Sequence, residues 1–185
     1  MERVEGTWKV SSAEAVRGFS AVAYYFGLDV YLELGVPIGL IQSAWGGTPA
    51  EAWTDFAYLH TSPTLTPITT RWEDFYAEME TYEQQYQAKL EAWTKEVEKA
   101  REEGKKGPRR PRPPVQLRES HRPAWLFNGM IAPLAPYAMR GVIWYQGESN
   151  RGRPGEYKDL FSTMIESWRN VFGQGDFPFY FVQIA

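Results

Sequence analysis

The feature that most constrains the fold is an apolar run that changes abruptly into polar residues. Val142–Tyr145 is apolar and β-prone without interruption, and Gln-Gly-Glu-Ser-Asn follows at 146–150. A continuous apolar run of this kind is typical of a strand that is buried on both faces. In open α/β sheets, ligands bind at the carboxyl ends of the strands. The run therefore predicts an α/β fold with a candidate site at 146–150, although a polar loop after a core strand has the same pattern.

A second strand and a glycine turn are expected earlier in the chain. Val36–Gln42 is a short β-branched run, and Ser-Ala-Trp-Gly-Gly follows at 43–47. Pro49 then favours the first position of a helix. A strand, a glycine turn and a helix N-terminus leave backbone N–H groups free to bind a ligand or an anion. Gly46 and Gly47 are therefore candidate donors, although an isolated Gly-Gly is usually only a turn.

Helical periodicity predicts three further elements, and an apolar run predicts a third core strand. The expected helices run from Ser11 or Ser12 to Leu34, from about Thr70 to Glu103 and from Tyr157 to Val171, and the strand covers Phe177–Ile184. A short helix and turn are expected over Leu126–Tyr137, which contains Pro133 and Pro136. The buried face of the first helix is predicted to comprise Val16, Phe19, Ala23, Phe26, Val30 and Leu34, and that of the last helix Leu160, Phe161, Met164, Ile165 and Trp168.

Residues from about 65 to 120 differ in composition from the rest of the chain. Residues 101–122 carry eight Lys/Arg against three Glu, a local charge of +5, whereas the remainder carries −8. Four prolines between 108 and 114 oppose a helix and favour an extended chain. We interpret 65–120 as an insertion, a long helix and a basic connector, within one domain over 1–185. The basic tract is expected to be solvated, the alternative being a site for an acidic partner.

Composition argues against several classes of function. A net charge of −3 argues against a general nucleic-acid binder. The absence of Cys excludes disulfides, thiol nucleophiles and thiolate metal sites. The sequence contains no run of 18 apolar residues, so no membrane span is expected, and residues 1–6 lack a signal-peptide pattern. No metal-ligand cluster or phosphate-binding loop is present in the sequence, so no metal or cofactor is expected.

Serine-type ester hydrolysis would need a nucleophile, a base, an orienting carboxylate and oxyanion donors. The sequence has two histidines, His60 and His121, and neither follows a predicted strand. Ser149 lies between a strand and a helix, but the Gly-x-Ser-x-Gly motif is absent. Ser43 is no better supported as a nucleophile. The sequence therefore shows candidate oxyanion donors without an evident nucleophile–base pair.

Four stretches of the chain together resemble one enzyme family. They are Phe19–Gly27, Gly39–Trp53, Gly141–Asn150 and Gly173–Gln183, and they occur in the order found in the sialate O-acetylesterases, carbohydrate esterases of the SGNH/GDSL-type hydrolase superfamily. The resemblance implies a three-layer, flavodoxin-like α/β fold and a cofactor-free, serine-type reaction. The implied substrate is an acetylated sugar, sialic acid or a relative. For the full-length family, a periplasmic or extracellular location is expected.

The resemblance also implies that parts of the family pattern are missing. In this family the nucleophilic serine lies in an upstream Gly-Gln-Ser-Asn block, and the Asp and His lie in a downstream Asp-x-x-His block. We therefore expect an incomplete fold that lacks the first strand and the final catalytic loop. We also expect the chain alone to be inactive as an esterase. The serine-bearing strand of the superfamily lies between the strands matched by Val36–Gln42 and Gly141–Gln146, so two unpaired edges are expected. The alternative is a non-catalytic carbohydrate-binding or interaction domain.

The matched residues would supply the oxyanion donors and the substrate contacts. The resemblance assigns the oxyanion to the backbone N–H of Gly46 or Gly47 and to a side-chain amide, for which superfamily members usually use Asn. Gln146 is the expected amide and Asn150 the alternative. Glu148 is expected to contact substrate or to act as a structural hydrogen-bond acceptor. The complete set of expected substrate contacts is Trp45, Gly147, Glu148, Ser149 and Arg151.

Overall fold

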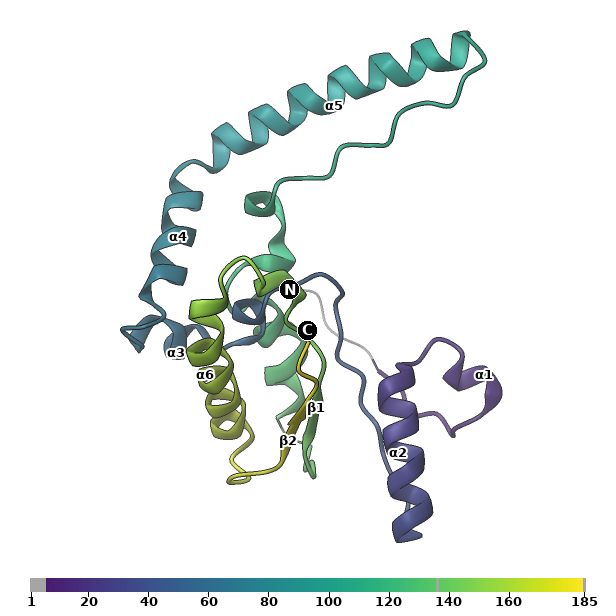
Figure 1. Ribbon diagram of the computed structural model, residues 1–185, viewed down its shortest axis with the longest axis vertical. Coiled ribbons are helices and arrows are strands. Elements are labelled where there is room, and N and C mark those ends of the chain that lie inside the picture. The colour runs from purple at the N-terminus through teal and green to yellow at the C-terminus, as the bar shows by residue number, and fades with distance from the viewer. Residues whose placement is uncertain (1–5, 136, 185) are drawn as a thin grey trace.

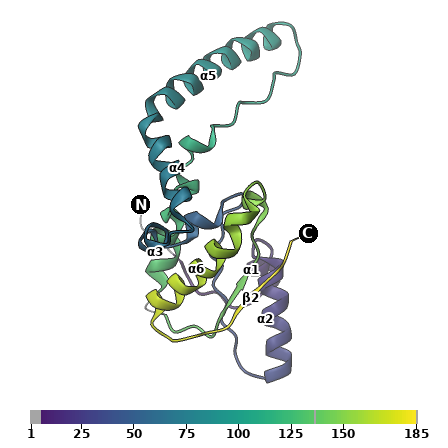
Figure 2. The same ribbon diagram turned by 60° about the vertical axis from the view of Figure 1, so that its left-hand side comes forward.

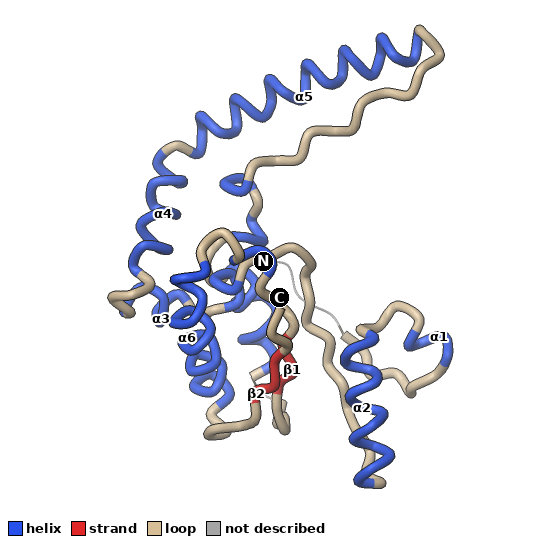
Figure 3. The backbone as a smooth tube through the Cα atoms, in the orientation of Figure 1, coloured by secondary structure: helices blue, strands red, loops and turns tan. Residues whose placement is uncertain are grey.

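The computed structural model describes residues 6–135 and 137–184, and the expected turn at Pro136 lies outside the described residues, as does most of the N-terminal segment 1–6. The structure combines helices with a small parallel sheet (Figures 1 and 3), as expected for an α/β protein. Strand β1 (Val142–Trp144) pairs with β2 (Phe179–Phe181), with Ile143 opposite Tyr180. Helix α6 (Pro154–Phe172) connects the two strands.

Helix α6 covers one face of the sheet and forms the centre of the core. Leu160, Met164 and Trp168 are buried on its inner face, as predicted. The Trp168 ring packs edge-on against Trp144 of β1, at 5.7 Å between centroids, and its indole N–H donates to Trp53 O at 2.7 Å. Gly173 ends the helix in the left-handed conformation.

The expectation that β1 is buried on both faces is wrong. Trp144 is buried against α6, whereas Ile143 is half-buried and Tyr145 is 58% exposed. Successive side chains of a strand point to opposite faces. Ile143 and Tyr145 therefore lie on the opposite face, which lines a cavity. The last strand is also shorter than expected, because pairing covers only three residues of 177–184.

The helix predicted from residue 12 to residue 34 is two helices, α1 (Ala13–Val16) and α2 (Ala21–Leu34). Ser12 caps the first and Gly35 ends the second, as the sequence indicates. The break occurs at Gly18, a poor helix former, and at Ser20, whose hydroxyl caps a new helix by accepting from Ala23 N at 3.3 Å. The predicted buried face is also wrong, because Phe26 is 41% and Leu34 62% exposed.

The strand predicted over Val36–Gln42 is absent. The segment runs extended beside α2, with Leu40 packed against Gly27, but no strand pairs with it among the described residues. A strand is defined by its ladder of hydrogen bonds to a neighbour. Here the Gln42 side chain instead accepts a hydrogen bond from Ser20 N at 2.6 Å. The described sheet therefore has two strands and not the three expected.

The helix expected after Pro49 is a short 3-10 helix, η1 (Ala50–Trp53), with Pro49 at its N-cap and not at its first position. Helix α3 (Phe56–Thr61) follows, and Asp55 caps it. Shorter helical turns follow later in the chain. They are η2 (Val115–Leu117), η3 (Glu119–His121), η4 (Phe127–Ile131), η5 (Ala132–Leu134) and η6 (Glu148–Asn150). Of these, η4 contributes Phe127 and Ile131 to the core.

The long helix predicted over residues 70–103 divides at Glu78 into α4 (Thr66–Ala77) and α5 (Met79–Glu102). Trp72 of α4 is buried, whereas α5 has no buried residue and projects away from the core (Figures 1 and 2). The extended connector returns beside α5, where Trp93 donates to Pro108 O at 3.0 Å. Helix α5 therefore contacts the connector and is not packed along the core.

Candidate functional site

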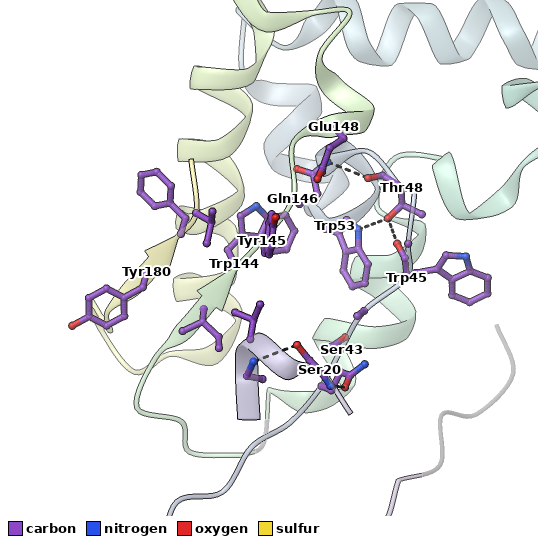
Figure 4. A pocket seen from close by; sticks show the side chains of 18 of the residues that line it. Ser20, Ser43, Trp45, Thr48, Trp53, Trp144, Tyr145, Gln146, Glu148 and Tyr180 are labelled. Carbon is purple, nitrogen blue, oxygen red and sulfur yellow. Dashed lines mark hydrogen bonds between the residues drawn. The ribbon is translucent and has the colours of Figure 1, made fainter. Parts of the chain in front are cut away.

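The glycine turn and the loop after β1 meet at a cavity of about 690 Å³. Figure 4 shows Trp45 and Thr48 on one side of it and Tyr145 and Gln146 on the other. The face of the sheet opposite α6 and the start of α2 complete its wall. The structure thus brings together six of the nine residues predicted for the site, which are Trp45, Gly46, Gly47, Gln146, Glu148 and Ser149.

The Gly46–Gly47 turn lines this cavity. Neither glycine N–H donates a hydrogen bond to an acceptor among the described residues. Gly47 has φ of 78°, a conformation that strains any residue with a side chain. The turn is fixed from below, because the Thr48 hydroxyl donates to Trp45 O at 2.7 Å and accepts from the Trp53 indole at 2.9 Å. The donors are therefore held in place without a ligand.

The Gln146 side chain connects the two loops. Its amide nitrogen donates to Thr48 O at 3.1 Å and to Asn150 Oδ1 at 2.8 Å. Its amide oxygen accepts from the Tyr157 hydroxyl at 3.1 Å. Burial raises the pKa of Tyr157 above its ordinary value, so the phenol stays protonated as the donor. Both amide hydrogens of Gln146 are therefore in use, and a ligand oxygen would have to replace one of these acceptors.

Asn150 lies beneath the cavity and is 3% exposed. Its Oδ1 accepts from Ala50 N at 2.9 Å, and its Nδ2 donates to Glu51 Oε2 at 2.8 Å. These opposite partners fix which end of the amide is oxygen. Asn150 therefore ties the loop after β1 to η1 through a buried network that also includes Gln146.

The sequence analysis missed the carboxylate at the centre of this network. Glu51 is 2% exposed, and its second oxygen accepts from Arg153 Nη2 at 2.7 Å. Arg153 also pairs with Glu156 at 3.2 Å, and Glu156 accepts a two-fold hydrogen bond from Arg71. The available signal was a carboxylate placed inside the otherwise apolar Ala-Glu-Ala-Trp segment of η1.

The remaining predicted contacts lie outside this cavity. Gly147 is buried, with φ of 153°, and a Cβ there would meet Ile184 Cδ1 at 2.8 Å. A close approach of this kind requires glycine. Arg151 is exposed and lines a second cavity together with Glu51. Gly147 therefore shapes the loop from within, whereas Arg151 faces a different space.

The two histidines occupy different environments. His60 stacks on Phe56 of α3, with 5.9 Å between ring centroids. His121 is half-buried, lies near the Gly47 backbone and forms a hydrogen bond with Ser120 Oγ at 3.3 Å. Burial lowers the pKa of His121, nearby Arg118 lowers it further, and the Gly47 contact opposes both. The imidazole is therefore neutral at pH 7.

Neither histidine is bonded to a candidate nucleophile. The Ser43 hydroxyl donates to Met130 O at 3.1 Å, and within the described part of the chain no hydrogen bond joins a histidine to Ser43 or Ser149.

Among the described residues, no cluster of three or more His, Asp or Glu is arranged to hold a metal ion. None of the described helices combines the length and apolarity that a membrane span requires.

Comparison with known proteins identifies relatives over most of the chain. The family described as "Carbohydrate esterase, sialic acid-specific acetylesterase" matches residues 118–185. A protein named sialate O-acetylesterase from Mus musculus is 35% identical over 174 residues, and the match covers 90% of this chain and 29% of that protein. The Homo sapiens protein of the same name is 33% identical, with 90% and 25% covered. The chain is therefore similar over most of its length to the sialate O-acetylesterases, and it spans 29% and 25% of the length of these two relatives.

Proposed function

We propose that this chain supplies the oxyanion-binding and substrate-contacting half of a carbohydrate O-acetylesterase active site. The observation that carries the proposal is that Gly46 and Gly47, whose N–H groups have no hydrogen-bond acceptor among the described residues, line the same cavity as Gln146. The relatives are named for the hydrolysis of acetylated sialic acid. The proposed substrate is therefore an O-acetylated sialic acid or a related sugar, and the proposed framework is the three-layer SGNH-type fold.

In the proposed reaction, a serine hydroxyl attacks the acetyl carbonyl and loses its proton to a histidine. The carbonyl oxygen becomes an oxyanion, and preorganised N–H donors stabilise this charge better than they stabilise the neutral ester. The sugar oxygen leaves with the proton, and water then releases acetate from the serine. Gly46 and Gly47 would hold the oxyanion, and Gln146 would contribute one hydrogen now given to Asn150 or Thr48.

We propose that the nucleophile and its base belong to the Gly-Gln-Ser-Asn and Asp-x-x-His blocks of the family. The absence of a bonded Ser–His pair at Ser43 and Ser149, within the described residues, supports this division. The chain as given is accordingly expected to have no esterase activity. The insertion over 65–120 is proposed to be an appendage of the same domain, because Trp72 of α4 is part of the core whereas α5 is exposed.

The test compares the chain with a longer polypeptide that adds both blocks. The longer polypeptide should release acetate from an O-acetylated sialic acid, and the chain alone should not hydrolyse nitrophenyl acetate above the buffer rate. Failure of the longer polypeptide to release acetate would overturn the proposal. Turnover by the chain alone that is lost in Ser149→Ala would make Ser149 the nucleophile.

A second function is a non-catalytic carbohydrate-binding domain. The observation in its favour is that both hydrogens of the Gln146 amide are already donated within the protein. In that case the cavity would bind acetylated and deacetylated sugar equally, because no developing oxyanion has to be stabilised. Binding of the sugar with no acetate release from the longer polypeptide would favour this function.

A further inference from the structure

A second cavity, of about 430 Å³, adjoins the first. Gly47, Glu148 and Ser149 line both cavities, so the two spaces meet at these residues. Trp72 and Phe75 of α4 give the second cavity an apolar wall suited to a sugar ring. A ligand whose acetyl group lies at Gly47 can therefore extend into this space.

Four arginines line the second cavity, and two of them are already neutralised. Arg71 donates from both terminal nitrogens to Glu156, at 3.1 Å each. Arg153 donates to the buried Glu51 at 2.7 Å. These pairs are held by good geometry and carry no spare positive charge for a ligand.

The other two arginines, Arg118 and Arg151, have no carboxylate partner among the described residues. Arg118 donates its Nε to Pro113 O at 2.9 Å, which orients the guanidinium and leaves its terminal nitrogens without a described acceptor. The Arg151 side chain forms no described hydrogen bond. Guanidinium groups present their donors in a planar fork that matches a carboxylate.

The other titratable groups in the cavity leave a net positive charge. His121 adds none, because burial lowers its pKa. Glu148 has no ion-pair partner in the described part of the chain and stands where the two cavities meet. Among the residues that line this cavity, two guanidinium groups and one carboxylate thus have no described ion-pair partner, and Glu148 is available to accept hydrogen bonds from sugar hydroxyls.

We propose that the second cavity binds the carboxylate of an acidic sugar, with Arg118 and Arg151 as its ligands, while the acetyl ester of the same sugar lies at the Gly46–Gly47 turn. This inference rests on the proposed function and assigns to Arg118 and Arg151 the selection of an acidic over a neutral acetylated sugar. A neutral acetylated sugar lacks the group that these two arginines bind.

The test is the titration of the longer polypeptide, which adds both missing blocks, with N-acetylneuraminic acid and with its methyl ester, which differ in the carboxylate charge. The acid should bind at least about tenfold more tightly than the ester, as expected for a charge-assisted bidentate contact. In Arg118→Gln/Arg151→Gln, affinity for the acid should fall to that for the ester, and affinity for the ester should not change. Arg112→Gln removes an exposed connector charge and should change neither value.

Equal affinity for acid and ester in the otherwise wild-type longer polypeptide, or binding of neither, would overturn the inference. Because Arg118 also donates to Pro113 O, the single variant Arg151→Gln is measured beside the double variant. An unchanged preference for the acid in both the single and the double variant would likewise overturn the inference. Failure of the proposed function gives a different result. If the longer polypeptide deacetylates the acid and the methyl ester equally well, the proposed esterase function stands and the carboxylate site is refuted. If it binds the acid selectively but releases no acetate, the carboxylate site stands and the esterase function is refuted.

Discussion

Helices α2 and α6 show opposite relations between sequence pattern and burial. α6 has charged residues on one face and apolar residues on the other, and Leu160, Met164 and Trp168 on the apolar face are buried. α2 is apolar around most of its circumference, yet Gly27 is its one buried residue. A helix that is apolar on all sides is normally buried. The difference shows that α6 has a complete partner surface among the described residues and α2 does not.

The accessible surface is large for a protein of this size. The accessible surface is 13147 Å², against roughly 9,100 Å² expected for a compact 21.3 kDa chain. The projecting α5 and the uncovered α2 both contribute to this difference. In addition, β1 pairs with one strand, which leaves its other edge unpaired within the described residues. Exposed apolar faces and unpaired strand edges both favour association.

The largest expected effect is on the state of association. The isolated chain should be aggregation-prone or only partly folded, because the apolar surface of α2 and the edge of β1 are uncovered. Leu32→Lys, at a position that is 70% exposed, should reduce association. Gel filtration combined with thermal unfolding measures this, and a cooperative transition from a monodisperse monomer would contradict the expectation.

Next in size is the loss of stability when the α6 face is truncated. Trp168→Ala should lower the free energy of unfolding by about 3–5 kcal/mol, because it leaves a cavity among Trp144 and Phe179 and removes the bond to Trp53 O. The matched variant Leu32→Ala in α2 should change it by less than about 0.5 kcal/mol. Denaturant titration of both variants tests the contrast, and equal losses would show that α2 is packed as tightly as α6.

A smaller loss is expected in the network beneath the site. Glu51 accepts from Asn150 and Arg153, so a glutamine at 51 must turn its NH₂ group toward one of these donors. Glu51→Gln should therefore cost about 1–3 kcal/mol. Lys105→Gln breaks an exposed pair with Glu103 and should cost less than about 0.5 kcal/mol. Similar values for the two variants would mean that the network does not hold the loops together.

The smallest expected effect is a pH dependence from His121. Its pKa is lowered in the folded state, so below about pH 6.5 the unfolded chain binds more protons than the folded chain. This contribution to stability is complete above that pH and is lost as the pH falls. The difference in unfolding free energy between wild type and His121→Gln, measured from pH 8 to pH 5, should therefore change with pH. A constant difference would contradict the burial of His121.

The sequence predicted the fold correctly where neighbouring elements of the chain pack against each other. The amphipathic pattern of α6 and the apolar runs at β1 and β2 predicted two strands with a helix between them, and the structure confirms all three elements and shows that the strands pair in parallel. The break at Gly18 could be anticipated only from local helix propensity, which tertiary packing often overrides. The prediction of a strand at Val36–Gln42 is wrong because a β-prone segment forms a strand only beside a neighbour to pair with, and no neighbouring strand lies there among the described residues.

The position of the candidate site could be predicted from the sequence, but the roles of its individual residues could not. The sequence identified both loops, and the structure brings them together at one cavity. Gln146 and Asn150 could not be separated, because their difference lies in burial and in bonding to residues about 100 positions away in the chain. The role of Glu51 was hidden for the same reason.

The proposal that Gln146 and the Gly46–Gly47 turn form the oxyanion site is tested most directly by kinetics of the longer polypeptide. Gln146→Ala should lower kcat by about 10²–10³ with little change in KM, because an oxyanion donor acts in the transition state. Asn150→Ala should chiefly reduce stability, because Asn150 is buried and bonded to Ala50 and Glu51. A wild-type kcat in Gln146→Ala, with a large loss in a stably folded Asn150→Ala, would contradict this account and assign the donor to Asn150.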